Sequence, residues 1–406
     1  MKITAKEKEV LRDLAKKYAE ISNMPTQKER YERGRDINDL KPRRPIVWLD
    51  EIPWHEMDID GKLNLICEDE FAKQMEQHFR RTLYRWEYIQ GDMVVEDAYN
   101  IQRHFTSTGE GLEVERDGDH TNVMSHAFID QLDTLEKIEA MHTPILTAYP
   151  EIDNARVMWA NDILDGILPV CLQGHYIYHA PWDRIPVYRG VTTALTDLAF
   201  EPEFTHAIMK KFTDCAFVAM RQMEKLGLLD AGISNLHCTP PYVSDFDPDP
   251  KPATMKTSWF RGMAQLFTEV SPQMFKEFEL DYVKPIMAEF GLVYYGCCER
   301  LDDKIDLLKT IPNLRKIGVS PWANPEVCAE QIGSDYVFAH KPNPSYVSGD
   351  FDADVVRDEI TRVIETCHKY GCPYEFVIKD ITTVGNKPQN LIAWTKTVKD
   401  VIDRYY

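Results

Sequence analysis

Hydrophobic side chains near the start of the chain recur at the spacing of an α-helix. The apolar positions of this first pattern are Val10, Leu11, Leu14, Tyr18 and Ile21. Thr4, with Glu7 three residues later, has the form of a capping box, which favours a helix that begins there. The pattern ends at Met24-Pro25, and a second, mostly polar helix is predicted over residues 27–36. Residues 1–45 are therefore predicted to form an N-terminal helical extension.

Beyond this extension, short apolar runs alternate with amphipathic stretches. The predicted strands lie at 46–49, between 90 and 106, and at 167–172, 233–238, 292–295, 316–319, 336–339 and 374–378. Helical patterns cover about 202–227, 301–309, 324–332, 353–370 and 387–403. Alternation of this kind predicts parallel strands joined by crossover helices. We therefore expect an α/β fold, the (β/α)8 TIM barrel, over residues 46–406, with residues 66–160 as insertions or a cap.

The excess of acidic residues argues against some classes of binding partner. The 406 residues include 47 Lys and Arg against 66 Asp and Glu, a formal net charge of −19. A chain this acidic is a poor electrostatic partner for nucleic acid or anionic lipid. It has no apolar stretch of the roughly 18 to 20 residues that a membrane-spanning helix needs, and a charged helix follows Met1 instead of the apolar core of a signal peptide. We expect a cytoplasmic protein that binds neither nucleic acid nor membranes.

Polar side chains follow the last five predicted strands. In a (β/α)8 barrel the loops after the strands converge on one mouth, where the working residues of such barrels lie. The segments in question are His237-Cys238, Gly296 to Arg300, Ser320 to Trp322, His340 to Asn343 and Lys379-Asp380. Thiol, imidazole and carboxylate groups therefore fall at the same end of the predicted barrel, and we place the candidate site there.

Cys297, Cys298 and Glu299 are the sharpest candidates for a metal site. The nine cysteines of the chain are an odd count without the spacing of a disulfide-rich scaffold, so reduced thiols or metal ligands are expected. Adjacent residues of an extended chain point to opposite faces, so one thiol faces the mouth, and a turn at this point lets Glu299 join it. One thiolate with carboxylate or imidazole ligands suits a catalytic Zn²⁺ that keeps one position open. The alternative is a buried cysteine pair beside a structural contact between Glu299 and Arg300.

Other residues at the strand ends extend this candidate site. Asp380 is a further ligand candidate, or else the cap of the helix that follows it. His237 and His340 are candidates for a metal ligand or a proton donor. Trp322 is a candidate stacking surface for a flat substrate, with core packing as the alternative. The predicted substrate contacts are Trp322, Asn343, Arg189 and Lys341.

Three blocks of the sequence resemble the uroporphyrinogen decarboxylase superfamily. Residues 266–298 are similar to a helix of the form SPEMFREF…PY in its methyltransferase branch, followed by a strand that ends His-x-Cys-Gly. Residues 188–204 match an upstream RG…L…PE block, and residues 377–391 lie where that branch has a Gly-Cys-Gly turn before P-x-N. The resemblance covers roughly residues 160–400 and implies a (β/α)8 barrel.

The resemblance also implies a chemistry. Corrinoid-dependent methyltransferases of that branch bind zinc through His-x-Cys and a later Cys, and act with the cobalt of a partner protein. Here Tyr295 stands at the His position if Cys297 is the first Cys, and Asp380 lies near the late Cys. Harder oxygen and nitrogen ligands suit the polarisation of a methoxy oxygen. The resemblance thus implies demethylation of a methoxylated or other methylated small molecule, with zinc in the site and cobalamin on a corrinoid carrier protein.

Two alternatives keep the fold and change the activity. The true decarboxylases act on a carboxylated tetrapyrrole without a metal, and they need several cations in the mouth. The candidates for that role here are Arg43, Arg44, Arg189 and Arg300. The second alternative is a non-catalytic protein that binds a corrinoid or a tetrapyrrole. In every case residues 1–160 are assigned to a cap or to the surface of a homodimer.

Overall fold

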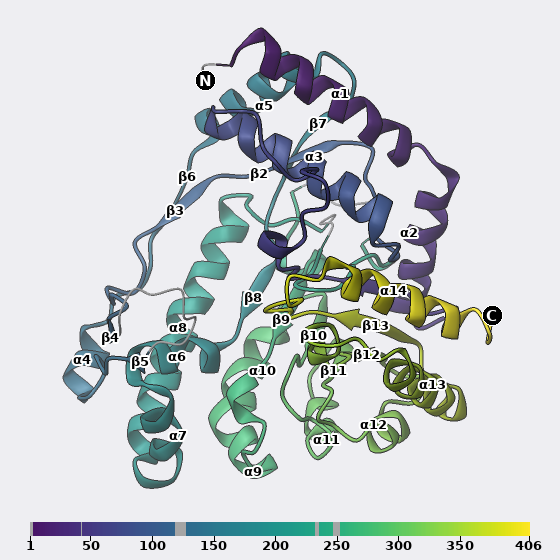
Figure 1. Cartoon of the computed structure of the whole chain (residues 1–406). Helices are drawn as coiled ribbons and strands as arrows, with labels where there is room; N and C mark the ends of the chain where they lie inside the picture. Colours follow the sequence, from purple (N-terminus) through teal and green to yellow (C-terminus); the bar gives the residue numbers. More distant parts are fainter. Residues whose placement is uncertain (1–2, 42, 118–126, 232–234, 247–251) are drawn as a thin grey trace.

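A curled β-sheet and the helices along its outer face make up the lower half of the molecule, and a second group of helices lies above them (Figure 1). The computed structural model describes residues 3–41, 43–117, 127–231, 235–246 and 252–406. The architecture is α/β. Within these ranges, no helix is both long enough and apolar enough to cross a membrane.

The helices and strands have the following bounds. The helices are α1 (Ala5–Ser22), α2 (Pro25–Asn38), α3 (Glu70–Tyr88), α4 (Leu135–Ala140), α5 (Pro150–Leu164), α6 (Pro181–Arg189), α7 (Val191–Phe200), α8 (Pro202–Lys225), α9 (Pro272–Phe275), α10 (Asp281–Met287), α11 (Ile305–Leu308), α12 (Pro325–Ile332), α13 (Ala353–Tyr370) and α14 (Pro388–Ile402). The strands are β1 (Val47–Leu49), β2 (Tyr99–Gln102), β3 (Phe105–Ser107), β4 (Arg116–Asp117), β5 (Ala127–Phe128), β6 (Leu146–Ala148), β7 (Val170–Gln173), β8 (Ile177–His179), β9 (Trp259–Gly262), β10 (Leu292–Tyr295), β11 (Leu314–Val319), β12 (Val337–His340) and β13 (Tyr374–Ile378).

The main sheet has seven parallel strands in the order β1-β13-β12-β11-β10-β9-β8. From β8 to β13 each strand lies beside its successor in the chain, with helical segments between them. This is the arrangement of successive βαβ units, which places all carboxyl ends of the strands at one edge. The strands predicted at 292–295, 316–319, 336–339 and 374–378 are confirmed as β10 to β13.

The strands at the β8 and β9 end of the sheet differ from the predicted eight-stranded barrel. The strands expected at 167–172 and between 90 and 106 pair with each other as β7 and β2, in a separate two-stranded sheet. Their places in the main sheet are taken by β8 and β9, which the pattern did not predict because β8 is three residues long and β9 carries a central arginine. The described pairings do not join β1 to β8, so seven curled strands are established and a closed barrel is not.

The segment predicted as a strand at 233–238 has a different structure. Its first residues, up to 234, lie outside the described ranges, and His237 and Cys238 have φ angles of 38° and 74°, which no strand has. The chain instead bends, with the Leu236 N–H donating to the Thr239 carbonyl at 2.8 Å. The Thr239 hydroxyl reaches Glu375 of β13 at 2.6 Å. This segment therefore lies on the concave side of the sheet.

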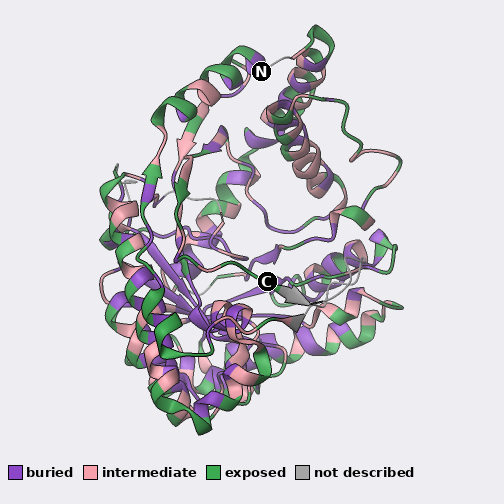
Figure 2. Ribbon diagram, turned by 90° about the vertical axis from the view of Figure 1, so that its left-hand side faces the viewer, coloured by how far each residue is buried: buried purple, intermediate pink, exposed green. Residues whose placement is uncertain are grey.

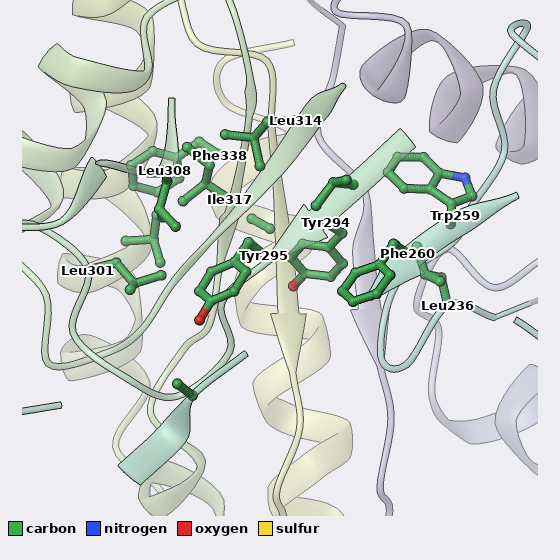
Figure 3. Close-up of a cluster of buried hydrophobic side chains, with 14 of the residues drawn as sticks. Leu236, Trp259, Phe260, Tyr294, Tyr295, Leu301, Leu308, Leu314, Ile317 and Phe338 are labelled. Carbon is green, nitrogen blue, oxygen red and sulfur yellow. The ribbon is translucent and has the colours of Figure 1, made fainter. Parts of the chain in front are cut away.

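Alternate side chains of the strands pack against the surrounding helices. Figure 3 shows aromatic side chains of β9 and β10 beside Ile317 and Leu314 of β11. Phe260 and Tyr295 belong to this outer core, and both are fully buried. The residues between them in the sheet, Arg261 and Tyr294, point to the opposite, concave side, where they contact each other. The concave side of the sheet is therefore polar, unlike its helix-covered side.

A second hydrophobic cluster lies above the sheet. It joins α1, α3 and α5 to β2 and β7, with Leu11, Phe79 and Ile163 fully buried. The predicted first helix is confirmed, including its capping box from Thr4. Trp48 of β1 and Val377 of β13 belong to the same cluster. Figure 2 shows the buried strands of the main sheet below this upper group, enclosed by helices with exposed outer faces.

Candidate active site

Two cysteines and an aspartate meet at the carboxyl edge of the sheet. The Cys297 and Cys298 sulfurs, just after β10, are 3.8 Å apart. The Cys298 thiol donates to Asp380 Oδ2, just after β13, at 2.8 Å. Because β11 and β12 separate these two strands in the sheet, the site forms only when the sheet curls. The structure therefore brings together Cys297, Cys298 and Asp380, which were all predicted as candidate ligands at the strand ends.

Lys379 contacts the Cys297 sulfur. The Lys379 ammonium donates to Cys297 Sγ at 2.8 Å and lies 3.1 Å from Asp380 Oδ2. The pKa of Cys297 lies well below its usual range, chiefly because the Cys298 thiol is hydrogen-bonded to its sulfur, and His237, Arg261 and Lys379 act in the same direction, against the effect of burial. The same sulfur contact and burial raise the pKa of Cys298. One thiolate and one thiol therefore face each other.

Glu299 positions the loop that carries the cysteines. Its carboxylate accepts the N–H of Cys297 at 2.9 Å and the N–H of Ala264, just after β9, at 3.0 Å. Both oxygens are therefore occupied by backbone donors, and the side chain is 1% exposed. Its neighbour Arg300 bonds Asp302 instead of Glu299. In this arrangement Glu299 ties two strand ends together, and its predicted role as a ligand or acid stays a prediction.

Glycine makes the turn into the cysteine pair possible. Gly296 has a φ of +93°, and a Cβ there would lie 2.3 Å from Leu301 Cδ1. On the neighbouring strand, a Cβ at Gly318 would lie 2.4 Å from the Gly296 carbonyl oxygen. A larger residue at Gly318 would push the two strand ends apart, and one at Gly296 would displace Leu301 and strain the backbone.

A second group of potential ligands adjoins the first. Ligand atoms of Glu51, His237 and Cys238 lie within 4.8 Å of one another, as do those of Cys297, Cys298 and Asp380. The groups meet where the Asp380 N–H donates to Glu51 Oε2 at 3.0 Å.

Glu51 is a site residue that the sequence analysis missed. It lies two residues after β1, so its place just beyond a predicted strand was the available signal. Burial, aided by a hydrogen bond with Asp380, raises the pKa of Glu51 to about 7. Its carboxyl group therefore keeps a proton close to neutral pH, unlike an ordinary glutamate.

The cysteine group opens into a cavity of about 440 Å³. Its lining includes Cys298, Asp380, Trp322, Lys341 and Asn343. Trp322 is 61% exposed, so it serves the cavity and not the core. Asn343 also caps the short helix after it, through its side chain and the N–H of Ser345. Asp380, Trp322, Lys341 and Asn343, predicted site residues from the ends of three strands, thus share one cavity with Cys298.

Two predicted site residues lie elsewhere. His340 points to the outer side of the sheet, where its Nε2 is 3.0 Å from Glu359 of α13. Arg189, at the end of α6, pairs with Asp197 at 2.8 Å and with Asp130 at 2.5 Å. The structure does not bring either residue to the cysteines. His237 does lie beside Cys297, and its Nε2 is buried without a hydrogen-bond partner among the described residues.

The donor set fits a divalent metal such as zinc. Cys297, Cys298 and Asp380 supply two sulfurs and a carboxylate oxygen, and three protein ligands leave a fourth position for substrate. The unpartnered nitrogen of His237 offers another donor of a kind that zinc binds. Lys379 would have to release the Cys297 sulfur for the metal to bind it.

Comparisons with known proteins bear on the fold. No protein-family model matches this chain, and no curated protein matches it either. Among solved structures it is similar to a methyltransferase from Methanosarcina mazei, with a TM-score of 0.50 and 11% sequence identity. The likeness covers 93% of this chain and 99% of that one. At this identity the likeness shows a shared fold along nearly the whole chain.

Proposed function

We propose that this chain is a corrinoid-dependent methyltransferase that demethylates a methoxylated or other methylated small molecule. The observation that carries the proposal is the Cys297, Cys298 and Asp380 group at the carboxyl edge of the sheet, open to a cavity with an exposed tryptophan. The similar solved structure, itself a methyltransferase, supports methyl transfer in general. In this proposal the methyl acceptor is the cobalamin of a carrier protein that docks at the mouth.

The chemistry requires a stabilised leaving group. Breaking a methyl–oxygen bond leaves an alkoxide or phenoxide, which is a poor leaving group without nearby positive charge or a proton. A zinc ion held by Cys297, Cys298 and Asp380 would supply Lewis acidity to that oxygen. Glu51 is the residue suited to provide the proton, because its carboxyl group remains protonated near neutral pH.

The remaining residues position the substrate. Trp322 offers an exposed aromatic face on which a flat ring can stack. Glu299 keeps the cysteine loop at a fixed distance from the end of β9 through its two backbone contacts. The cavity volume of about 440 Å³ is in the range of pockets that hold small molecules.

Tetrapyrrole decarboxylation has less support. The arginines available for a polycarboxylate are engaged with acids: Arg43 with Asp36, Arg44 with Asp403, Arg189 with Asp197 and Arg300 with Asp302. None of these arginines lines the cavity beside the cysteines. We therefore retain decarboxylation, and pigment binding without turnover, as outcomes of the test.

The test combines metal analysis with a methyl-transfer assay. Protein purified without a metal-affinity tag should contain about one zinc per chain. The Cys297→Ser/Cys298→Ser variant should lose it, whereas Cys171→Ser, at an exposed thiol on β7, should keep it. Transfer of the methyl group from a methoxyphenol to reduced cobalamin, followed by absorbance, should be lost in the same double variant.

Three other outcomes would contradict the proposal. If the parent protein contains no metal and the double variant transfers methyl groups equally well, then neither metal binding nor catalysis depends on the two cysteines. Release of carbon dioxide from a carboxylated porphyrinogen by the metal-free protein favours the decarboxylase. Tight binding of a tetrapyrrole without turnover favours the pigment-binding protein.

A further inference from the structure

Four cationic side chains lie in the concave interior of the sheet. They are Arg261, Lys316, Lys341 and Lys379, and each is at most 3% exposed. Arg261 and Lys316 are the direct strand neighbours of Tyr294, on either side of it. Burial of a charge is costly unless an opposite charge accompanies it. In a chain with a net charge of −19, such a concentration of positive charge requires an explanation.

Two of the four cations have anionic partners. Lys316 bonds both carboxylate oxygens of Glu375 at 2.9 Å. Lys379 bonds the Cys297 sulfur at 2.8 Å. Lys379 also lies 3.1 Å from Asp380 Oδ2.

The other two have no acidic partner among the described residues. Arg261 donates Nη1 to the carbonyl of Gly262, while its Nε and Nη2 have no hydrogen-bond partner. Lys341 Nζ has none at all. Both cations face the Tyr294 ring, with Arg261 Cζ 3.8 Å and Lys341 Nζ 5.4 Å from its centre. The positive charges of Arg261 and Lys341 are therefore not paired with a carboxylate of the described residues.

Lys341 connects this charge to the candidate active site. It lines the same cavity as Cys298, Asp380 and Trp322, and it follows directly after β12. Its neighbour His340 points outward to Glu359, so Lys341 is the residue of this pair that faces the concave side. The cavity therefore adjoins a buried ammonium group that has no hydrogen-bond partner among the described residues.

We propose that the small molecule bound in this cavity carries a carboxylate, and that the Lys341 ammonium binds it. The proposal rests on the proposed function and specifies its substrate as a methylated acid. A singly charged carboxylate matches one free ammonium group supported by the field of Arg261, whereas a phosphate dianion generally takes several donors. The rest of the molecule then extends past Cys298 to the face of Trp322, since these residues line one cavity.

The test uses a pair of probes that differ only in charge. Benzoate and benzamide have nearly the same shape, and benzamide is neutral. We expect isothermal titration of the full chain to show saturable binding of benzoate, with benzamide at least tenfold weaker. Lys341→Met should weaken benzoate at least tenfold, Lys341→Arg should restore part of the affinity, and Lys387→Met, at an exposed lysine paired with Asp350, should change nothing.

Unfolding experiments test whether Lys341→Met loses binding only because it folds poorly. Because Lys341 is buried without an acid, Lys341→Met should unfold at the same or a higher urea concentration than the parent. A structural lysine would instead give a less stable variant. Lower stability together with unchanged benzoate affinity would overturn the assignment.

The binding results stand apart from the methyl-transfer assay, because they need neither cobalamin nor a methyl donor. Equal affinity for the two probes, or absence of saturable benzoate binding at millimolar concentrations, would overturn the carboxylate site even if methyl transfer is observed. Binding of inorganic phosphate without binding of benzoate would likewise overturn it. Selective benzoate binding without methyl transfer would sustain the site and refute the proposed reaction.

Discussion

At the scale of single residues, the concave side of the sheet contains a fully buried ion pair between Lys316 and Glu375. Lys316 and Glu375 are both fully buried, and the Thr239 hydroxyl completes the group by hydrogen-bonding both. Burial lowers the pKa of Lys316 to about 8, against the opposing effect of Glu375. Such a pair adds little net stability, but removing one partner leaves the other charge buried alone.

A double-mutant cycle at this pair should show that removing one charge costs more stability than removing both. We expect Lys316→Met to lower the free energy of unfolding by about 3 to 5 kcal/mol. Lys316→Met/Glu375→Leu should recover most of that loss, because neither charge then remains. Urea denaturation of the parent, both single variants and the double variant measures the difference, and a double variant as unstable as Lys316→Met would contradict this account. Lys387→Met, on the surface, is the control.

At the scale of elements, α3 is the helix that joins the upper cluster together. Its Phe79 is fully buried, and its His78 lies among the rings of Tyr18, Phe79 and Tyr99. Desolvation beside these rings lowers the pKa of His78 from 6.5 to about 4, although the residue is exposed to solvent in part. In the unfolded chain the imidazole takes up a proton first as the pH falls, so folding becomes less favourable between about pH 6.5 and 4.

His78→Phe should therefore reduce the acid sensitivity of the fold. The parent holds this stability above pH 6.5 and loses it towards pH 4, and because His78 is an exposed residue, solvent keeps the effect small. We expect the gap in unfolding free energy between His78→Phe and the parent to widen over this range in favour of the variant. His55→Phe, at an exposed imidazole, is the matched control. A gap that does not change with pH would refute the role of His78.

At the scale of the whole molecule, the upper cluster and the main sheet share residues. Trp48 and Val377 come from strands of the sheet but belong to the upper cluster with Leu11 and Phe79. The Asn38 amide at the end of α2 also donates to the carbonyls of Pro240 and Tyr242. The first 160 residues are thus packed onto the sheet by apolar and polar contacts together.

This sharing predicts cooperative unfolding. Phe79→Ala should cost about 3 to 5 kcal/mol, the usual range for a buried phenylalanine. Because the upper cluster includes strands of the sheet, tryptophan fluorescence and far-ultraviolet circular dichroism should still report one coincident urea transition. Two separate transitions would show instead that the upper group is an independent domain.

Most of the elements that position the site could be predicted from local sequence. The capping box at Thr4 and Glu7, the strand at 292–295 and the helix that begins at Pro202 are all found as expected. Each depends on residues within one turn or one apolar run. The strand β9 was missed because Arg261 interrupts its apolar run, and that arginine is tolerated only because the concave side of the sheet is polar.

The sequence by itself determined which chemical groups stand at the ends of the strands, since the order of strands and loops follows from local pattern. Cys297, Cys298 and Asp380 were identified on this basis. Only the tertiary structure decided which of these groups meet. The curl of the sheet brings Asp380 to Cys298 across two intervening strands. It also leaves the Lys341 ammonium buried without a hydrogen-bond partner among the described residues. Strand alternation turns His340 to the outer side of the sheet, but its partner there, Glu359, belongs to another element, and no local pattern records such contacts.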